Sequence, residues 1–596
     1  MRCVGPNCLG VVNTHPDVRM DGCFAESLPE RGNIGFVSQS GALGGGILNI
    51  LKDLNLGFAQ FISIGNQADV NAETALEYWE NEEDVEQILL YMESIQNPAN
   101  FRKLASRISK KKPVLALKAG RSAAGASAAS SHTGSLAGAD KAANALLQQS
   151  GVIREYSLKN LFATAKVFAN CPIPKGDRVA IITNSGGPGI MATDAISEYG
   201  MQMAKITDET KEKLRSFLPS AASVKNPIDM IASAPIEHYK QTLETVIADP
   251  NVDMIITIYL PFLGLKDIDV AQALMEIKAE HPEKPIIGVF MTKSEFFTKL
   301  SNMNVNMPFF MYAEEAADGL NRLNQQRLWM ERPEGKTPVY DVDHERAKQI
   351  IRKSISEGRA QLTTRESIDV LDAYGIRVCK SGFATTEDEA VSIANSIGYP
   401  VVMKMTSKTT SHKTDVGGVR VNIQSEEQLR AEYQDLIAKL TEKGLIDGLE
   451  GVIIQEMVKG SREMVCGIAT DPQYGPMMMF GLGGVFIEVL KDVTFRIAPL
   501  TDVDAMEMIK SVKSYKLLEG ARGTKPAQLD QIQETLMRLS QLVHDFSFID
   551  ELDINPLLIS EKTGEGIAVD GRIKVRMEEA QKALVSACGA CSGCCH

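Results

Sequence analysis

Residues 32–48 read GNIGFVSQSGALGGGIL, and this stretch decides the fold of the first part of the chain. An apolar run, a turn of serine and glycine and a second apolar segment predict a strand, a tight turn and a helix. Further apolar runs follow at 61–65, 87–93 and 113–120, separated by longer amphipathic stretches. This alternation is typical of α/β architecture with a parallel sheet.

The same device occurs a second time at residues 178–192, which read RVAIITNSGGPGIMA. Apolar runs at 254–260 and 285–291 continue the pattern. Two successive segments that each open with a strand, a glycine turn and a helix predict two α/β domains, at 31–170 and 176–331.

The pattern changes after a polar, proline-bearing segment at 332–357, which we interpret as a linker. Apolar runs at 399–405, 451–458 and 476–482 are then separated by stretches of variable length. Such spacing favours an α+β domain over a doubly wound sheet. The sequence therefore predicts a third domain at 358–580.

The two ends of the chain fit neither pattern. Residues 1–30 contain turn residues but too little apolar chain for a domain, so we interpret them as the end of a domain that precedes them. Residues 581–596 form a cysteine-rich tail with the spacing C-x₂-C-x₂-C-C-H, which could chelate a soft metal. Because no core surrounds it, and the adjacent Cys594 and Cys595 rarely ligate one ion together, a disordered tail is the alternative interpretation.

The composition limits the kinds of partner. The 596 residues carry 76 acidic and 63 basic side chains, a net charge of −13, which argues against a nucleic-acid or anionic-membrane surface. No apolar run approaches the roughly 20 residues that span a bilayer, and the N-terminus lacks a signal-peptide pattern. Six cysteines are scattered, as in a reduced cytoplasmic protein. Small anions are still admissible ligands, because backbone N–H groups bind them regardless of net charge.

Two glycine turns are candidate phosphate sites. Ser38, Ser40 and Gly41 lie in the first turn, and Gly186 and Gly187 lie in the second. Small residues let the backbone approach an anion, and the first-turn N–H groups and the helix dipole favour negative charge. The alternative is two ordinary tight turns in two flavodoxin-like folds.

A segment of small residues holds one histidine. Residues 119–140 contain 17 Gly, Ala or Ser among 22, with His132 near the middle. Such a segment cannot pack a core and rearranges easily, so it suits a histidine that carries a phosphoryl group. Glu93, at the end of an apolar run, could hold the other ring nitrogen. The alternative is a surface loop with an incidental histidine.

The third domain holds candidate nucleotide-binding residues. Lys404 lies in an apolar run, where a lysine is costly unless it meets an anion such as a phosphate. Glu456 ends another apolar run and is followed by Met457 and Val458, a pattern suited to the edge of an adenine ring. Each residue taken singly has an ordinary structural alternative.

The end of the same domain holds a candidate metal site. Asn555 and Asp570 lie on two consecutive predicted strands, 549–559 and 566–575, and could face one another. One neutral and one charged oxygen ligand suit Mg²⁺, which also keeps waters and phosphate oxygens.

Six motifs together resemble one known family. They are SQSGAL (38–43), SSHTGSLAG (130–138), ITNSGGPGI (182–190), MKMTSKTTSHKTDVGGV (403–419), GPMMMFGLGGVFIEVLKDVTFRIAP (475–499) and DINPL (553–557). The chain resembles the nucleoside-diphosphate-forming acyl-CoA synthetases, which include ADP-forming acetate–CoA ligase and, more distantly, succinyl-CoA synthetase. The resemblance runs from residue 1 to about 580.

The resemblance implies two flavodoxin-like ligase domains and an ATP-grasp domain in one α/β chain. It also implies a Rossmann-like CoA-binding domain, of which only residues 1–30 are present. Acyl-CoA and phosphate would give an acyl phosphate, His132 would take the phosphoryl group, and its loop would carry it to ADP. Glu93 matches the supporting carboxylate of the family. Asp553 and His412 match a carboxylate near the relocated histidine and a second relay histidine.

The same resemblance implies the cofactors and partners. ATP or ADP would contact the positions that match Lys404 and residues 456–458, and Mg²⁺ those that match Asn555 and Asp570. CoA, an acyl group and phosphate complete the substrates. We expect a cytoplasmic homodimer that binds neither nucleic acid nor membrane, with a separate CoA-binding chain as an alternative source of the first domain.

Two alternative functions are compared with the sequence features. Protein lysine acetyltransferases that share this scaffold carry a further domain and tend to lose the phosphohistidine, whereas 21 residues follow Val575 here and His132 is present. A non-catalytic or half-reaction-only nucleotide-binding remnant is the second alternative, because most of the CoA-binding domain is missing. The sequence does not distinguish the acyl group, ADP from GDP, or the physiological direction.

Overall fold

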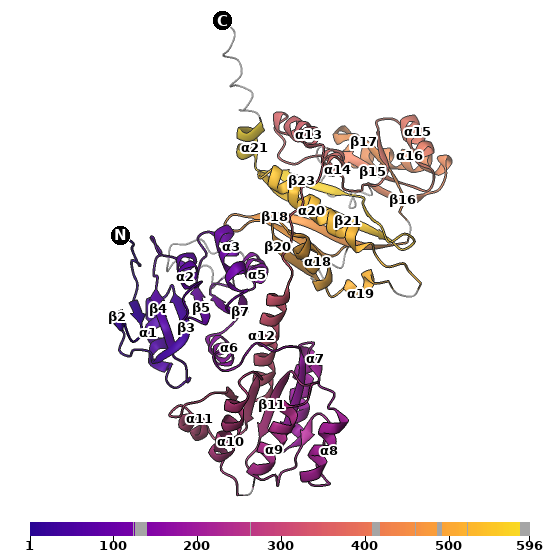
Figure 1. Cartoon of the computed structure of the whole chain (residues 1–596). Coiled ribbons are helices and arrows are strands. Elements are labelled where there is room, and N and C mark those ends of the chain that lie inside the picture. Colours follow the sequence, from indigo (N-terminus) through magenta and orange to yellow (C-terminus); the bar gives the residue numbers. More distant parts are fainter. Residues whose placement is uncertain are drawn as a thin grey trace. The chain divides into compact units, whose positions relative to one another are not determined.

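The computed structural model describes residues 1–122, 124, 140–262, 264–407, 418–458, 460–484, 492–520 and 523–584. The chain divides into two compact units, Met1–Arg332 and Pro333–His596, which are drawn in Figure 1. His132, His412 and residues 585–596 of the cysteine-rich tail lie outside the described residues, whereas residues 581–584 belong to a helix. The helices that are described include none that is long and apolar enough to cross a membrane.

The first domain of unit 1 is built on a seven-stranded sheet with the strand order β2-β1-β4-β3-β5-β6-β7. The strands are β1 (Gly10–Asn13), β2 (Met20–Cys23), β3 (Arg31–Ser38), β4 (Phe58–Ser63), β5 (Gln87–Met92), β6 (Val114–Lys118) and β7 (Ile153–Glu155). Strands β4, β3, β5, β6 and β7 run parallel to one another, as the sequence predicts. The described helices are α1 (Gly41–Ile50), α2 (Ala72–Trp79), α3 (Pro98–Ile108), α5 (Asp140–Gln149) and α6 (Leu158–Asn170).

The first 30 residues belong to this sheet. Strands β1 and β2 form a hairpin, and β1 pairs antiparallel with β4. The chain before β1 packs against the turn after β4, where Asn66 and Ala68 donate backbone hydrogen bonds to Pro6 and Gly5. The boundary that the sequence analysis places at residue 30 therefore falls within one continuous sheet.

The second domain of unit 1 has a six-stranded sheet with the order β10-β8-β11-β12-β13, and β9 pairs with β8. The strands are β8 (Arg178–Thr183), β9 (Gln202–Met203), β10 (Ile228–Asp229), β11 (Met254–Tyr259), β12 (Ile286–Phe290) and β13 (Phe309–Phe310), and all run parallel. The helices are α7 (Gly186–Glu198), α8 (Asp208–Phe217), α9 (Ile236–Ile247), α10 (Asp267–Glu280), α11 (Ser294–Leu300) and α12 (Ala313–Glu331). In both domains the central apolar strands are buried, and helices follow them in the sequence.

Helix α12 joins the two domains of unit 1, and Figure 1 shows it running from the second toward the first. It packs on α7 of its own domain and on α6 of the first. The buried Glu155 carboxylate lies 3.1 Å from Arg322 of α12, and Lys110 donates to the carbonyls of Trp329 and Arg332 at the end of the helix. A cation at a helix C-terminus satisfies carbonyls that have no partner within the helix.

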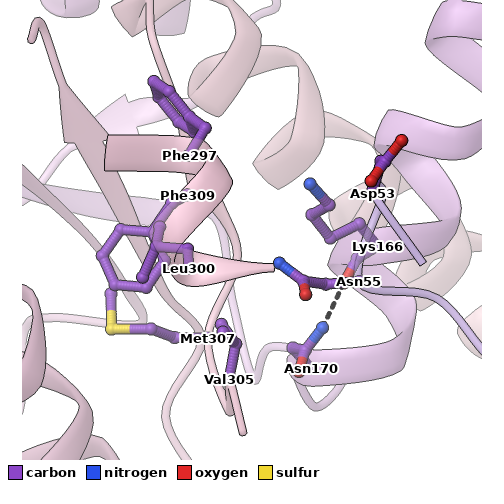
Figure 2. Close-up of a pocket in the computed structure, with 9 residues that line it drawn as sticks. All are labelled: Asp53, Asn55, Lys166, Asn170, Phe297, Leu300, Val305, Met307 and Phe309. Atoms are coloured by element: carbon purple, nitrogen blue, oxygen red, sulfur yellow. Dashed lines mark hydrogen bonds between the residues drawn. The ribbon is translucent and has the colours of Figure 1, made fainter. Parts of the chain in front are cut away.

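A small cavity of about 30 Å³ also lies at this junction (Figure 2). The first domain provides the polar wall of the cavity, which consists of Asp53, Asn55, Lys166 and Asn170. The second domain provides the apolar wall, which consists of Phe297, Leu300, Val305, Met307 and Phe309. Burial lowers the pKa of the Lys166 ammonium. The volume suits about one or two water molecules, so we interpret the cavity as part of the domain junction and not as a substrate site.

Replacing Gly151 by alanine is expected to destabilise unit 1 strongly. Gly151 has φ +67°, and an added Cβ would lie 2.0 Å from the Trp329 ring. The left-handed backbone costs an alanine about 1–2 kcal/mol, and the overpacking adds roughly 1–3 kcal/mol. Gly200 is the matched control, because it has φ +74° but open space around it. Urea unfolding of the full chain followed by circular dichroism should show a larger loss for Gly151→Ala. Equal losses would mean that the Trp329 contact is unimportant.

Unit 2 holds two sheets, in agreement with the predicted α+β organisation. A four-stranded sheet has the order β14-β17-β15-β16, and a six-stranded sheet has the order β20-β19-β18-β21-β22, with β23 paired to β21. The first contains β14 (Ser381–Ala384), β15 (Val401–Ser407), β16 (Val419–Ile423) and β17 (Leu449–Glu456). The second contains β18 (Ser461–Asp471), β19 (Gly475–Leu482), β20 (Val493–Ile497), β21 (Ile549–Ser560), β22 (Gly566–Ala568) and β23 (Gly571–Val575).

The helices of unit 2 form two groups with separate apolar cores. Helices α15 (Glu387–Ile397) and α16 (Glu426–Glu442) pack on the four-stranded sheet. The short helix η1 (Ile446–Gly448) comes directly before β17 in the chain. The remaining helices are α13 (His344–Ser356), α14 (Thr364–Ala373), α18 (Asp502–Ser511), α19 (Tyr515–Leu518), α20 (Leu529–Asp545) and α21 (Met577–Leu584). The buried apolar residues of these helices form one core with those of the six-stranded sheet. The two sheets therefore present an edge to each other within the same unit.

Candidate active site

The turn between β3 and α1 is built to leave N–H groups free for an anion. Ser40 is the N-cap of α1, and its hydroxyl accepts a hydrogen bond from the Leu43 N–H at 3.3 Å. The buried Ser38 hydroxyl donates to the Ser40 carbonyl at 2.7 Å, which fixes the turn. An added Cβ on Gly41 would lie 3.2 Å from the Leu9 backbone nitrogen, so a small residue is favoured there. Helix N-termini of this kind bind phosphate.

Glu93 lies beside this turn, directly after β5. The Gln39 side chain joins the two: its Oε1 accepts hydrogen bonds from the Glu93 and Ser94 N–H groups, at 2.6 and 3.1 Å, and its Nε2 donates to the Ser94 carbonyl at 2.7 Å. Glu93 itself is buried, and its Oε2 has no hydrogen-bond partner among the described residues. A buried carboxylate oxygen without a partner is costly, so it is available to a donor such as an imidazole N–H.

The turn between β8 and α7 repeats the arrangement. The Thr183 hydroxyl donates to the Ser185 carbonyl at 2.8 Å, as Ser38 does in the first domain. Gly186 and Gly187 are exposed, and an added Cβ on Gly187 would meet no atom within 4 Å. Ser185, the N-cap of α7, makes no side-chain capping bond to the first turn among the described residues. The two turns belong to different sheets, and no hydrogen bond joins them in the described part of the chain.

A cavity of about 300 Å³ opens beside the second turn, and it has no counterpart in the sequence predictions. It is lined by Asn184, Ala232, Ser233, Ala234, Pro235, Tyr259, Phe262, Gly264 and Leu265. Most of these side chains are small or apolar. Ile231, at the start of the lining loop, has φ +65°, a left-handed backbone that is strained for a β-branched residue. Ligands of doubly wound sheets bind at this edge, where the strand order reverses.

Lys118, at the end of β6, is a candidate functional residue that the sequence analysis did not identify. It is 2% exposed, and burial lowers the pKa of its ammonium, while the negative charges of Asp140 and Glu93 act in the opposite direction. Its Nζ donates to the Ala119 carbonyl at 2.7 Å. A lysine directly before the glycine and serine segment, in KAGRS, is a signal that could have identified it.

In unit 2 the predicted nucleotide and metal residues lie together. Lys404 of β15 is 9% exposed, and its Nζ lies 3.3 Å from Asp570 Oδ2 and 3.0 Å from the Val569 carbonyl. Gln455 of β17 donates to the same carbonyl at 3.2 Å. These bonds join the small sheet to the segment between β22 and β23 of the large sheet.

Asn555 lies across from Asp570. Strand β21 pairs Ile554 with Gly571 of β23 and Leu557 with Ala568 of β22, which places Asn555 opposite the break that holds Asp570. An amide and a carboxylate oxygen in adjacent strands fit the donor chemistry of Mg²⁺. The described residues contain no cluster of three His, Cys, Asp or Glu side chains that could hold a metal by themselves.

The end of β17 offers a backbone edge. The Glu456 N–H donates to the Lys380 carbonyl at 2.9 Å, and the Met457 N–H to the Pro400 carbonyl at 3.4 Å. The Val458 N–H donates to no backbone acceptor within the described ranges. This is the position where the sequence analysis places an adenine edge.

Asp553 lies on β21, two residues before Asn555 and opposite Arg572 of β23. Burial raises the pKa of its carboxyl, Arg572 lowers it, and the carboxylates of Asp570 and Glu551 raise it further. The structure therefore gathers Lys404, Asp553, Asn555 and Asp570 at one place in unit 2. The positions of His132 and His412 lie outside the described residues, so their predicted contacts with Glu93 and Asp553 remain predictions.

Three protein families match the chain in succession. The succinyl-CoA ligase-like flavodoxin domain matches residues 31–168, the ligase-CoA domain residues 179–317 and the ATP-grasp domain residues 353–575. This set defines a class of ligases that combine two flavodoxin-like domains with an ATP-grasp domain, as the sequence analysis expects.

Characterised relatives agree with this class. The 4-hydroxybutyrate–CoA ligase (ADP-forming) of Nitrosopumilus maritimus is 38% identical over 96% of this chain and 82% of its own length. Acetate–CoA ligase (ADP-forming) I of Archaeoglobus fulgidus is 38% identical over 94% of this chain and 80% of its own length. The chain belongs to the ADP-forming acyl-CoA synthetases, a family of acid–thiol ligases. The non-catalytic alternative finds no support among these relatives.

One solved structure matches across both the sequence and the fold. It is the acetyl-coenzyme A synthetase 1 of Ca. Korarchaeum cryptofilum in complex with phosphate and ADP, with a TM-score of 0.53 and 30% identity. The match covers 56% of this chain and 72% of that one. The predicted fold class is confirmed by this structure and by the three family matches.

Proposed function

We propose that this chain interconverts acyl-CoA, ADP and phosphate with an acid, CoA and ATP, through an acyl phosphate and a phosphohistidine. The observation that carries the proposal is the pair of helix N-terminal turns in unit 1, with the unpartnered oxygen of Glu93 beside the first. Such turns bind phosphate without a net positive charge. The acyl phosphate and the transferred phosphoryl group both require an anion site of this kind.

The first turn and Glu93 serve the phosphoryl transfer to histidine. The N–H groups at Gly41, with Gly186 and Gly187 of the second turn, bind phosphate oxygens, and the hydroxyls of Ser38 and Ser40 shape the first turn. A nitrogen of His132 attacks the phosphorus of the acyl phosphate, and the carboxylate leaves with the electron pair of the P–O bond. Glu93 accepts a hydrogen bond from the other ring nitrogen and stabilises the charge that develops on the ring.

The residues gathered in unit 2 serve transfer to the nucleotide. Lys404 neutralises phosphate charge, the backbone of residues 456–458 meets the adenine edge, and Asp553 orients the phosphohistidine. His412 is proposed as a relay from its sequence match alone. Mg²⁺ bound by Asn555 and Asp570 would neutralise charge on the transferring phosphoryl group.

The cavity of about 300 Å³ beside the second turn holds the rest of the acyl group. Its lining is mostly apolar and it adjoins α7, where the reacting carboxylate would meet phosphate. The volume admits a small aliphatic acid and excludes long chains.

Assembly and location are proposed from the sequence. A homodimer, a separate CoA-binding chain and a cytoplasmic location all remain predictions. Six described cysteines, Cys3, Cys8, Cys23, Cys171, Cys379 and Cys466, form no disulfide, which agrees with a reducing compartment.

The direct test is acid-dependent ADP release from MgATP with hydroxylamine present, which traps an acyl phosphate as a hydroxamate and requires no CoA. We expect a hydroxamate with acetate, propionate or butyrate, and a comparison of straight-chain acids identifies the preferred length. Absence of hydroxamate with every acid, together with no CoA-dependent turnover, would contradict the proposed function.

Ala232→Phe tests the cavity in the same assay. Ala232 is an exposed residue of the lining, so a larger side chain reduces the cavity without entering the core. We expect the preference for butyrate over acetate to fall about 10-fold or more, since one methylene in an apolar pocket is worth about 10–200-fold. Ala221→Phe, at an exposed alanine outside the lining, is the control. An equal loss for all acids would place the acyl group elsewhere.

A further inference from the structure

The two flavodoxin-like domains contain the same side-chain clamp. In the first domain the Gln39 amide bonds the backbone at Glu93 and Ser94, just after β5. In the second domain Asn184 Oδ1 accepts from the Leu260 N–H at 3.0 Å, and its Nδ2 donates to the Leu260 carbonyl at 2.9 Å, just after β11. Both amides are buried, at 6% and 3% exposure.

The clamps occupy equivalent places in the two sheets. Gln39 and Asn184 each follow the strand that precedes the glycine turn, β3 in one domain and β8 in the other. Each amide reaches the adjacent parallel strand, β5 or β11, at the point where the strand order reverses. Ligands bind at this point of a doubly wound sheet, so a rigid bond there fixes the ligand site and not merely the core.

We infer that Gln39 and Asn184 are positioning residues, which hold the groups after the adjacent strand in register with the two helix N-termini. Gln39 sets Glu93 against the α1 turn, and Asn184 sets the loop after β11, which lines the cavity, against the α7 turn. The inference rests on the proposed function of Glu93 and of that cavity. It assigns to these two buried amides the alignment of the anion site with the reacting group.

An amide side chain can fix the turn because it carries both an acceptor oxygen and a donor nitrogen. Oε1 of Gln39 accepts from two N–H groups while Nε2 donates to a carbonyl, so the side chain fixes the direction as well as the position of the turn. Without it the Glu93 and Ser94 N–H groups would be buried and unpaired, and the turn would move to find other partners. Because the Glu93 carboxylate extends from this turn, any shift changes its distance from the α1 N-terminus.

Hydrogen exchange tests the clamp without reference to activity. In Gln39→Leu the amide protons of Glu93 and Ser94 should exchange at least about 10-fold faster than in the unsubstituted chain. Gln87→Leu is the matched control, since Gln87 is a buried amide on β5 whose Nε2 donates to the Ala165 carbonyl at 3.1 Å, at the other end of the strand. Unchanged exchange at residues 93 and 94 in Gln39→Leu would overturn the inference.

Kinetics test whether Gln39 acts through Glu93. We expect Gln39→Leu to lower kcat for hydroxamate formation about 10- to 100-fold with less than about a 3-fold change in the KM for ATP, because misplacement of about 1 Å has an effect of this order. In a Glu93→Ala background, Gln39→Leu should cause no further loss. Gln87→Leu should retain kcat.

Additive losses in the double variant would overturn the positioning role, because a merely structural effect acts independently of Glu93. Gln39→Asn, which keeps the amide but shortens it by one methylene, should recover exchange protection or kcat only in part. Full recovery would also overturn the inference, since the reach of the side chain is what aligns the turn. If the unsubstituted chain shows neither hydroxamate formation nor CoA-dependent turnover, the proposed function fails, while the exchange result still decides whether the clamp holds the turn.

Discussion

His132→Ala should abolish phosphorylation of the chain by γ-labelled MgATP, with more than about a 100-fold loss of label. The unsubstituted chain should give an acid-labile, base-stable phosphoprotein, because a phosphoryl group on an imidazole nitrogen has that stability pattern. The prediction rests on the small-residue segment around His132 and on the unpartnered Glu93 oxygen, which lacks a donor within the described chain. A nucleophile that forms a covalent intermediate has no substitute in a neighbouring side chain.

A second histidine gives the control. His281, at the end of α10, lies 3.5 Å from the Glu283 carboxylate and far in sequence from every proposed site residue. His281→Ala should label as the unsubstituted chain does. Label that persists in His132→Ala, with the same acid lability, would mean that another histidine carries the phosphoryl group, and His412→Ala would then identify or exclude the proposed relay.

Asp570→Asn should weaken binding of MgADP about 100-fold, which corresponds to about 2.7 kcal/mol. The substitution keeps the shape of the side chain but removes the charge that faces Lys404 Nζ at 3.3 Å. It also removes the charged ligand of the proposed Mg²⁺ site, so attraction and geometry are both lost. Isothermal titration with ADP in the presence and absence of Mg²⁺ measures the effect, and labelling by ATP should fall in parallel.

The control is a substitution at Asp550, near the beginning of β21, the strand that pairs with β23. Asp550 of β21 lies 3.3 Å from Lys574 in a solvent-accessible pair, and such pairs contribute little. Asp550→Asn should change affinity for MgADP less than about 3-fold. If Asp570→Asn binds MgADP and labels normally, another residue holds the ion, and if affinity falls equally with and without Mg²⁺, Asp570 acts through Lys404 alone.

The local features of the chain were predictable from its sequence. Both strand–turn–helix segments and the α+β change after residue 358 follow from short-range patterns of apolar residues, and the structure confirms parallel strands in both domains of unit 1. The glycine turns were predictable for the same reason, because the residues that form them are adjacent in the chain. Lys404 was identified singly, as a lysine in an apolar segment, whereas Asp570 was predicted together with Asn555, because the two lie on consecutive predicted strands.

Long-range contacts were not predictable in this way. The Gln39 and Asn184 clamps join residues 54 or more positions apart, and nothing in a local pattern links them. The predicted strand 566–575 is two strands, β22 and β23, because the Val569 carbonyl between them accepts hydrogen bonds from Lys404 and Gln455. Neither donor is close to Val569 in sequence.

The hairpin of residues 1–30 shows the same limit. Its short strands carry too few apolar residues to predict a domain, yet they pair with β4 of the sheet that follows. The cavity beside α7 is a further case, since its lining comes from three separate loops.

The packing of Trp329 on Gly151 has a spectroscopic consequence. The chain contains two tryptophans, Trp79 in the core of the first domain and Trp329 at the junction of the first two domains, and both belong to unit 1. Unit 2 has none, so its own unfolding leaves the intrinsic indole emission unchanged. A shift in that emission on adding ADP, whose proposed site is in unit 2, would therefore show that nucleotide binding changes the surroundings of a tryptophan in unit 1.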